Sequence, residues 1–430
     1  MSTSEWKPSD SDRLTPERIQ LARMRRGLTK SQLARAIGVT PRSITTYETD
    51  GAPAATAGAL AEALEFPIAY FTRPDPADVS TADVNFRAAR RASAREKHAA
   101  VAAGVAGIEI DQWISERFKL PSVDLPTFVG EKPRTAARLL RAMWGLGTKP
   151  LPNLVQLAES RGIRVYSLPS MADAVDAYSI RRDEIPYVFL ARSKSPERTR
   201  FDLAHEIGHL VLHADESPDL VSEQEREADD FASEFLMPAP TIVEYLPQNP
   251  SVHDLLEARS LLRVSAMALA FAAHKAGRMS DWAYRQACIQ LSQRGYRTGE
   301  PGGMRHHEMS RVFPQVLGRH SESSAWTIAR DLDLPVSDVH DLTFGVELRI
   351  AQAAETGAGV QASEADPVIP PAPKLVSHGP GEDNAADPVP TYTPAPAPRK
   401  ALPTVAPKAT TPAPTPDTDA TDTTDTEGSN

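Results

Sequence analysis

The sequence predicts a mainly α-helical protein that contains one α+β domain. The N-terminal part has the spacing of short helices joined by tight turns, which indicates an all-α domain. Alternating β-type segments occur near the middle of the chain, and helical spacing resumes after them, which predicts a helical C-terminal region. The end of the chain is rich in Pro, Thr, Ala and Asp and buries too little apolar surface to fold, so we expect a disordered tail.

The 430 residues are too many for one ordinary hydrophobic core. Changes in composition and spacing suggest boundaries along the chain. We expect a flexible N-terminus (1–13), an all-α domain (14–73), a linker with connecting helices (74–151), an α+β domain (152–250), a helical region of unknown role (251–355) and an acidic, Pro-rich disordered tail (356–430).

Composition excludes several classes of protein. Cys288 is the one cysteine, so an internal disulfide and a cysteine-built zinc site are both excluded. There is no apolar run long enough to span a membrane, and Met1–Pro8 lacks the apolar core of a secretion signal. We therefore expect a cytoplasmic protein without membrane contacts.

The net charge of −10 hides a segregation of charge. Residues 13–73 hold nine Lys and Arg against five Asp and Glu, whereas residues 361–430 hold four against ten. The basic N-terminal module is thus the candidate for binding nucleic acid.

The α+β domain is predicted from three strands followed by two helices. The strands are expected at Gly162–Leu168, Ala174–Arg181 and Pro186–Ala191. The first helix has Ser195 as N-cap and Pro196 at its first position, and it should run to about residue 213.

This first helix carries the sequence His205-Glu206-Ile207-Gly208-His209. The two histidines are four residues apart, so both imidazoles leave the same helix face, as two ligands of one metal must. Glu206 adjoins the first ligand, where its carboxylate can take a proton from a metal-activated water and act as general base in peptide hydrolysis. We predict a Zn²⁺ site with one ion per chain, with Mn²⁺ as the alternative metal.

A catalytic zinc ion needs a third protein ligand. The candidates are His213, Glu223, Glu225, Glu227 and Glu234. His213 lies about 12 Å along the helix axis from the first histidine, at ~1.5 Å per residue. Ser222 is the expected N-cap of the second helix, with Glu225 as its capping-box partner. Glu227 lies at the margin of an apolar stripe, where a carboxylate is costly unless paired or metal-bound. We choose Glu227, with Glu223 or Glu225 as the fallback.

Two paired motifs resemble the ImmA/IrrE family of metallopeptidases, which implies a zincin-like fold. They are Phe201–Leu210, containing the His-Glu-x-x-His pattern, and Glu225–Ala232, followed by Leu236-Met237-Pro238. The similarity covers roughly residues 152–238. It implies that His205, His209 and Glu227 are the metal ligands and that Glu206 is the catalytic base. It also implies a substrate class, because members of this family cleave repressor proteins, often of the helix-turn-helix type.

One departure from the wider zincin pattern concerns the group that orients the first histidine. Thermolysin-like enzymes place an Asp four residues after the ligand glutamate, but counting from Glu227 that position is Phe231. Asp229 or Asp230 is the alternative for this role.

In the N-terminal domain, Leu28–Thr40 predicts a helix capped by Thr29 and a turn at Gly38. Thr40 then caps a second helix over Pro41–Glu48. This pattern resembles the XRE-family helix-turn-helix of lambda-type repressors, over about residues 14–71.

The resemblance implies that the second helix enters the major groove of a double-stranded DNA operator. Its expected base-contacting residues are Arg42, Ser43, Thr45 and Thr46, of which Arg42 can form a bidentate contact with guanine. The expected phosphate-contacting residues are Thr29, Lys30 and Gln32. We also expect a homodimer.

Three functions are compatible with these patterns. The first is a DNA-binding transcriptional regulator whose zinc-dependent endopeptidase domain cleaves a repressor protein or itself. The second is a transcription factor whose zincin domain senses a metal or ligand without proteolysis, and the third is an antitoxin-like repressor. Glu206 favours the first, because metal binding alone needs no general base. For self-cleavage, the candidate segment is the Pro-containing linker Thr72–Asp83, bound as a strand along a sheet that includes Pro186–Ala191.

Overall fold

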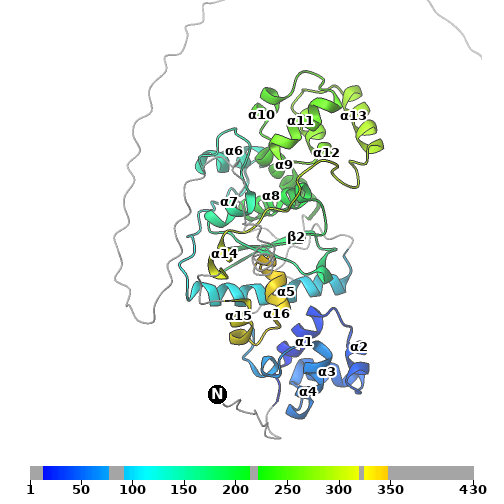
Figure 1. Cartoon of the computed structure of the whole chain (residues 1–430), viewed down its shortest axis with the longest axis vertical. Helices are drawn as coiled ribbons and strands as arrows, with labels where there is room; N and C mark the ends of the chain where they lie inside the picture. Colours follow the sequence, from blue (N-terminus) through cyan, green and yellow to red (C-terminus); the bar gives the residue numbers. More distant parts are fainter. Residues whose placement is uncertain (1–12, 77–91, 214–220, 319–323, 347–430) are drawn as a thin grey trace, which may run out of the picture. The chain divides into compact units, whose positions relative to one another are not determined.

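The computed structural model describes residues 13–76, 92–213, 221–318 and 324–346, and Figure 1 follows their elements along the chain. These residues are mainly helical and contain one three-stranded sheet, which confirms the predicted fold class. The predicted tail, almost all of the flexible N-terminus and residues 77–91 of the linker region lie outside the described residues. No helix in the described ranges is both long and apolar enough to cross a membrane.

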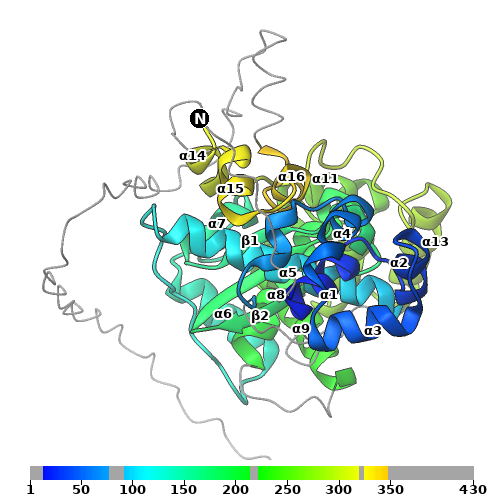
Figure 2. The same ribbon diagram turned by 90° about the horizontal axis from the view of Figure 1, so that it is seen from below.

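The N-terminal domain is a small helical bundle. It comprises α1 (Pro16–Arg25), α2 (Lys30–Ala36), α3 (Pro41–Asp50) and α4 (Ala57–Leu64), with short 3₁₀ helices η1 (Ala54–Thr56) and η2 (Ile68–Thr72). Its core includes Ile19, Leu33, Ile44 and Leu60, all fully buried. The four α-helices gather into one group in Figure 2, and α1 contacts both α3 and α4.

The predicted caps of α2 and α3 are confirmed. The Thr29 hydroxyl accepts from the backbone N–H of Gln32, whose side chain accepts in return from the Thr29 backbone, so α2 begins with a capping box. The Thr40 hydroxyl accepts from the N–H of Ser43 at the start of α3. Gly38 has φ +71°, the left-handed conformation that the turn between these helices requires and that glycine adopts without strain.

The sheet has strand order β1-β3-β2, with β1 (Arg164–Ser167) parallel and β2 (Ala177–Arg182) antiparallel to β3 (Ile185–Leu190). The β2–β3 hairpin closes through Asp183 and Glu184, both at positive φ, as expected for a tight turn that matches the twist of the strands. β3 is therefore the central strand and has a partner on each side, whereas β2 pairs with β3 alone among the described strands.

Two helices cover the sheet (Figure 1): α8 (Pro196–Leu212) contacts β2 and β3, and α5 (Ala94–Ser115) packs against aromatic side chains of these strands. Gly104 and Gly107 permit the close approach of α5. A Cβ at position 104 would clash with the Tyr178 hydroxyl, and one at position 107 would lie 2.7 Å from the Phe189 ring. Tyr178 donates a hydrogen bond to the Ala100 carbonyl, which fixes this contact.

Further helices surround this layer. α6 (Pro133–Met143) packs against α9 (Val221–Leu236), and α7 (Leu154–Ser160) contacts α8 and β1. After α10 (Ala239–Tyr245) come α11 (Val252–Leu262), α12 (Ala266–Lys275) and α13 (Asp281–Gln293), which contact one another.

The last described helices, α14 (Val312–Val316), α15 (Ala325–Leu332) and α16 (Val336–Leu342), return toward the sheet. Both α15 and α16 contact α5, and α16 also contacts β1. The chain leaves the helical conformation between α15 and α16. Asp333, which has φ +52°, ends α15, and Pro335 precedes α16. Residues 251–342 therefore contribute to two packing groups, one around α12 and one against α5.

Buried ion pairs attach the N-terminal bundle to these elements. Arg18 on α1 forms a two-pronged ion pair with Glu109 on α5, with N–O distances of 2.7 and 3.1 Å. Arg25 and Arg26 both contact Asp338 on α16, at 2.9 and 3.0 Å. Removing one partner of such a pair leaves a buried charge without compensation, so these contacts fix how α1 docks.

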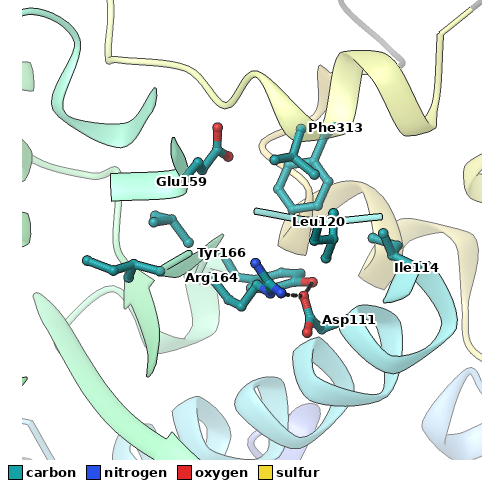
Figure 3. A pocket seen from close by; sticks show the side chains of 10 residues that line it. Asp111, Ile114, Leu120, Glu159, Arg164, Tyr166 and Phe313 are labelled. Atoms are coloured by element: carbon teal, nitrogen blue, oxygen red, sulfur yellow. Dashed lines mark hydrogen bonds and ion pairs between the residues drawn. The ribbon is translucent and has the colours of Figure 1, made fainter. Parts of the chain in front are cut away.

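A small pocket between α5, α7, β1 and α14 holds further buried charges (Figure 3). The Asp111 carboxylate accepts from the hydroxyls of Tyr166 and Tyr187, at 3.0 and 3.1 Å, and lies 3.3 Å from Nε of Arg164. Across the pocket, burial raises the pKa of Glu159 to about 7, although hydrogen bonds from Ser310 and the Arg311 backbone oppose this shift.

This burial predicts a pH-dependent contribution to stability. The folded-state pKa of Glu159 is raised above its ordinary value of 4.5, so its stabilising effect is complete below about pH 4.5 and is lost as pH rises to about 7. Glu159→Gln removes this proton equilibrium and keeps the shape of the side chain. We expect urea denaturation to show the wild type losing stability relative to Glu159→Gln over this window, by no more than about 1.4 kcal/mol per pH unit. A difference that is constant from pH 4.5 to pH 7 contradicts the prediction.

Candidate metal centre

Helix α8 carries the two histidines that the sequence singles out. It begins as predicted, with the Ser195 hydroxyl accepting from the Arg198 backbone and Pro196 in its first turn. His205 and His209 are both buried, and their Nε2 atoms lie 3.0 Å apart. The one-turn spacing thus brings both ring nitrogens to one point, as predicted.

Helix α9 runs against α8 at Gly208. A Cβ at this position would lie 3.0 Å from Cδ1 and 3.3 Å from Cβ of Phe231, which is itself fully buried. The absence of a side chain at Gly208 therefore lets α9 approach the histidines closely.

The third member of the cluster is Glu225. Its carboxylate oxygens lie 3.6 Å from Nε2 of His205 and 3.3 Å from Nε2 of His209. One ligand atom from each of these three residues lies within 4.8 Å of the others, the spacing that a shared metal ion requires. Glu225 is thus the alternative that the sequence left open as a fallback.

Glu227 lies outside this cluster, contrary to the sequence-based choice. At about 100° per residue, side chains two positions apart leave nearly opposite sides of a helix, so Glu225 and Glu227 cannot converge on one ion. The sequence also placed Ser222 at the N-cap of this helix, but α9 already includes Val221, so Ser222 lies inside it.

Asp229 occupies the position four residues after Glu225, and its Oδ1 lies 3.0 Å from Nδ1 of His205. If Glu225 rather than Glu227 is the ligand glutamate, the Asp four residues later is present, and the chain follows the thermolysin-like pattern. A carboxylate on Nδ1 holds a histidine ring in place and fixes the proton on that nitrogen, so that Nε2 is free to bind a metal.

Glu206 is buried on the side of α8 that faces the sheet. Its Oε2 accepts a 2.7 Å hydrogen bond from the hydroxyl of Ser179 on β2. Sequence reasoning missed Ser179, because a lone serine in a strand has no distinctive spacing. This bond orients the carboxylate next to the histidine pair.

Burial and neighbouring charges set the ionisation of the centre. Burial raises the pKa of Glu206 to about 7, against the effect of His205. Burial also lowers the pKa of His209 to about 4, which keeps this ring neutral. For His205, burial opposes protonation, but the carboxylates of Asp229 and Glu225 outweigh it and raise the pKa to about 10. A concentration of shifted groups like this is typical of functional sites.

The donor atoms fit a divalent cation. Two Nε2 atoms face each other across 3.0 Å, and Oε1 of Glu225 is buried there without a hydrogen-bond partner. Such an arrangement of electron pairs is unfavourable unless a proton or a cation lies between them. Two imidazoles and one carboxylate are also a donor set used by catalytic zinc sites, which leave one position open.

In the N-terminal bundle, the predicted DNA-contacting side chains differ in availability. Arg42, Thr45 and Thr46 on α3 are exposed. The Ser43 hydroxyl is hydrogen-bonded to Thr40 at 2.9 Å, and Lys30 Nζ lies 3.2 Å from Oε2 of Glu48.

The side chains of Thr29 and Gln32 bond each other in the capping box at the start of α2. The backbone N–H groups of this helix end remain suited to a phosphate, because a helix N-terminus carries partial positive charge.

The fold and the histidine–glutamate cluster define a metallopeptidase-like domain joined to a helix-turn-helix domain. Each of these two domains matches a known family model. Residues 158–274 match the family model described as an IrrE N-terminal-like domain, and residues 19–71 match a helix-turn-helix model. The chain thus combines an XRE-type helix-turn-helix with an ImmA/IrrE-type metallopeptidase domain, in the predicted order. No protein of curated function matches the sequence.

Proposed function

We propose that this protein is a DNA-binding transcriptional regulator whose second domain is a zinc-dependent endopeptidase. The observation that carries the proposal is the convergence of His205, His209 and Glu225 beside the buried carboxylate of Glu206. The helix-turn-helix match implies DNA binding, and the IrrE-like match supports a peptidase-type domain.

In this proposal His205, His209 and Glu225 hold the zinc ion, and Mn²⁺ is the alternative. The bound ion supplies a Lewis acid that polarises water and the peptide carbonyl. Glu206 accepts the proton of the attacking water and returns it to the leaving amine. Ser179 keeps the Glu206 carboxylate in place through its 2.7 Å hydrogen bond, and Asp229 holds the His205 ring.

The substrate is proposed to bind as an extended segment along β2. Pro186–Ala191 belongs to the sheet, as predicted, but it forms the central strand β3, which is hydrogen-bonded on both sides and offers no free edge. β2 is the edge strand next to α8, and it carries Ser179, the partner of Glu206. A peptide added to β2 would therefore pass close to the general base.

A separate repressor protein is the proposed substrate, with the linker of this chain as the alternative. The start of the linker is anchored, because the Pro74 carbonyl accepts from Arg18 and Arg73 lies 3.0 Å from Asp333. Residues 77–83 lie outside the described part of the chain. Mass spectrometry of the protein with and without zinc, alone and mixed with a candidate helix-turn-helix repressor, tests both forms of cleavage.

A metal sensor without proteolysis is the second candidate, and the burial of the centre favours it. Glu206 is 2% exposed and His209 is 4% exposed, so a peptide must displace neighbouring groups to reach them. New peptide termini that depend on Glu206 support the peptidase. Zinc binding without cleavage of the chain or of its partner supports the sensor.

The proposed ligand set predicts the zinc content of three variants. Glu225→Ala should lose zinc affinity by orders of magnitude, because one of three protein ligands is removed. Glu206→Gln should keep the metal and abolish hydrolysis, since the amide cannot accept a proton. Glu227→Ala should remain loaded in excess zinc.

Elemental analysis after dialysis measures these contents, with circular dichroism as the control for folding. A zinc-loaded Glu225→Ala together with a zinc-free Glu227→Ala would restore Glu227 as the third ligand and overturn the proposed set.

For DNA, we propose that the exposed face of α3 reads the bases and that the protein binds its operator as a homodimer. Arg42→Ala should weaken binding to the preferred operator by ~1–3 kcal/mol and relax selectivity at one base pair. Lys30→Ala should weaken binding evenly across sequences and reduce the salt dependence, because a phosphate contact is lost.

Selection from a random DNA pool, followed by titration at several salt concentrations, measures both effects. Arg285→Ala is the matched control, since this exposed arginine lies on α13, outside the helix-turn-helix. Unchanged sequence preference in Arg42→Ala argues against the assigned face.

A further inference from the structure

A chain of polar side chains extends from the proposed metal centre to the surface. The Nδ1 atom of His209 lies 3.0 Å from Nδ1 of His213. On its other side, His213 Nε2 lies 2.9 Å from Oε2 of Glu227. The His213 side chain is 1% exposed, whereas Glu227 is 37% exposed, so the chain runs from the interior toward solvent.

His213 is held in this position by its backbone. It is the C-cap of α8, and its N–H donates to the carbonyl of His209 at 3.0 Å. One turn of helix therefore places the two rings against each other, with centroids 5.2 Å apart. The ring of His213 is held on both sides, by His209 at 3.0 Å and by Glu227 at 2.9 Å.

The order of donors along this chain follows from the carboxylate at its end. An ionised carboxylate only accepts hydrogen bonds, so Nε2 of His213 must carry a proton to bond Glu227. If the His213 ring is neutral, its Nδ1 is then an acceptor and takes a hydrogen bond from Nδ1–H of His209. The proton of His209 is thus placed on Nδ1, and its Nε2 is left with a free electron pair.

We propose that His213 and Glu227 are positioning residues that set the tautomer of His209, so that its Nε2 faces the metal centre ready to coordinate. This inference rests on the proposed function, because it takes His209 as a ligand. For His205, the carboxylate of Asp229 contacts Nδ1 directly, at 3.0 Å. For His209, the carboxylate of Glu227 acts through the ring of His213.

The proposal gives Glu227 a role other than ligation. Its carboxylate is two hydrogen bonds away from the ligand nitrogen of His209 rather than next to the ion. Loss of a group that orients a metal ligand typically costs 10–100-fold in metal affinity, well below the cost of losing a ligand.

The test combines zinc affinity with the tautomer of His209. Zinc affinity of the full chain is measured by competition with a chromophoric chelator. We expect His213→Leu to bind zinc on the order of 10–100-fold more weakly, because the acceptor for His209 is lost. His213→Asn places an amide oxygen near the position of Nδ1, so it should recover most of this loss. Asp230→Ala is the matched control, because it removes a carboxylate from α9 that pairs with Arg134 and not with a histidine.

The tautomer is read in the metal-free protein with ¹⁵N-labelled histidine, by long-range nitrogen–proton correlation. Wild type and His213→Asn should show His209 protonated at Nδ1, and His213→Leu should shift the proton toward Nε2. Glu227→Ala should shift it partly, because His213 then loses the carboxylate that fixes its own tautomer.

Three results would overturn the relay. These are wild-type zinc affinity in His213→Leu, equal losses in folded His213→Leu and His213→Asn, or a His209 ring protonated at Nε2 in the wild type. A wild-type protein that binds no zinc refutes the proposed function instead. In that case the tautomer measurement still judges the relay on its own.

Discussion

The close contact between α8 and α9 is the constraint on which the proposed metal centre depends. Gly208 leaves room for Phe231, and this contact brings the helices near enough for one carboxylate of α9 to meet both histidines of α8. Once the facing surfaces are fixed, helical geometry determines each role. Glu225 and Asp229 are one turn apart and both meet the histidines, whereas Glu227 leaves another side of α9 and contacts His213.

The sheet supplies the other half of the environment. α5 approaches it closely through Gly104 and Gly107, and α8 covers the opposite face. As a result, Glu206 lies between α8 and β2, where Ser179 holds it and water is largely excluded. The same arrangement leaves β2 as the edge strand beside Glu206, the proposed general base, so the support of this carboxylate and the proposed substrate edge belong to one element.

The helix-turn-helix is attached by its α1 side, away from the residues expected to read DNA. The ion pairs of Arg18 with Glu109 and of Arg25 with Asp338 are buried, whereas Arg42 on α3 is exposed. Because a buried ion pair is costly to break on one side, these contacts favour one docking geometry.

The sequence by itself determined what depends on near neighbours in the chain. The caps at Thr29, Thr40 and Ser195, the helix-turn-helix and the convergence of His205 and His209 all follow from spacings of a few residues, which helical geometry converts directly into positions. The choice between Glu225 and Glu227 was different, because it depends on which face of α9 is turned toward α8. The edge position of β2, the bond from Ser179 and the link through His213 likewise depend on segments that meet only in the folded chain. Tertiary packing decided all of these features. The rotation of one helix against another is set by the side-chain volumes on both helices, and local spacing along the chain does not encode that rotation.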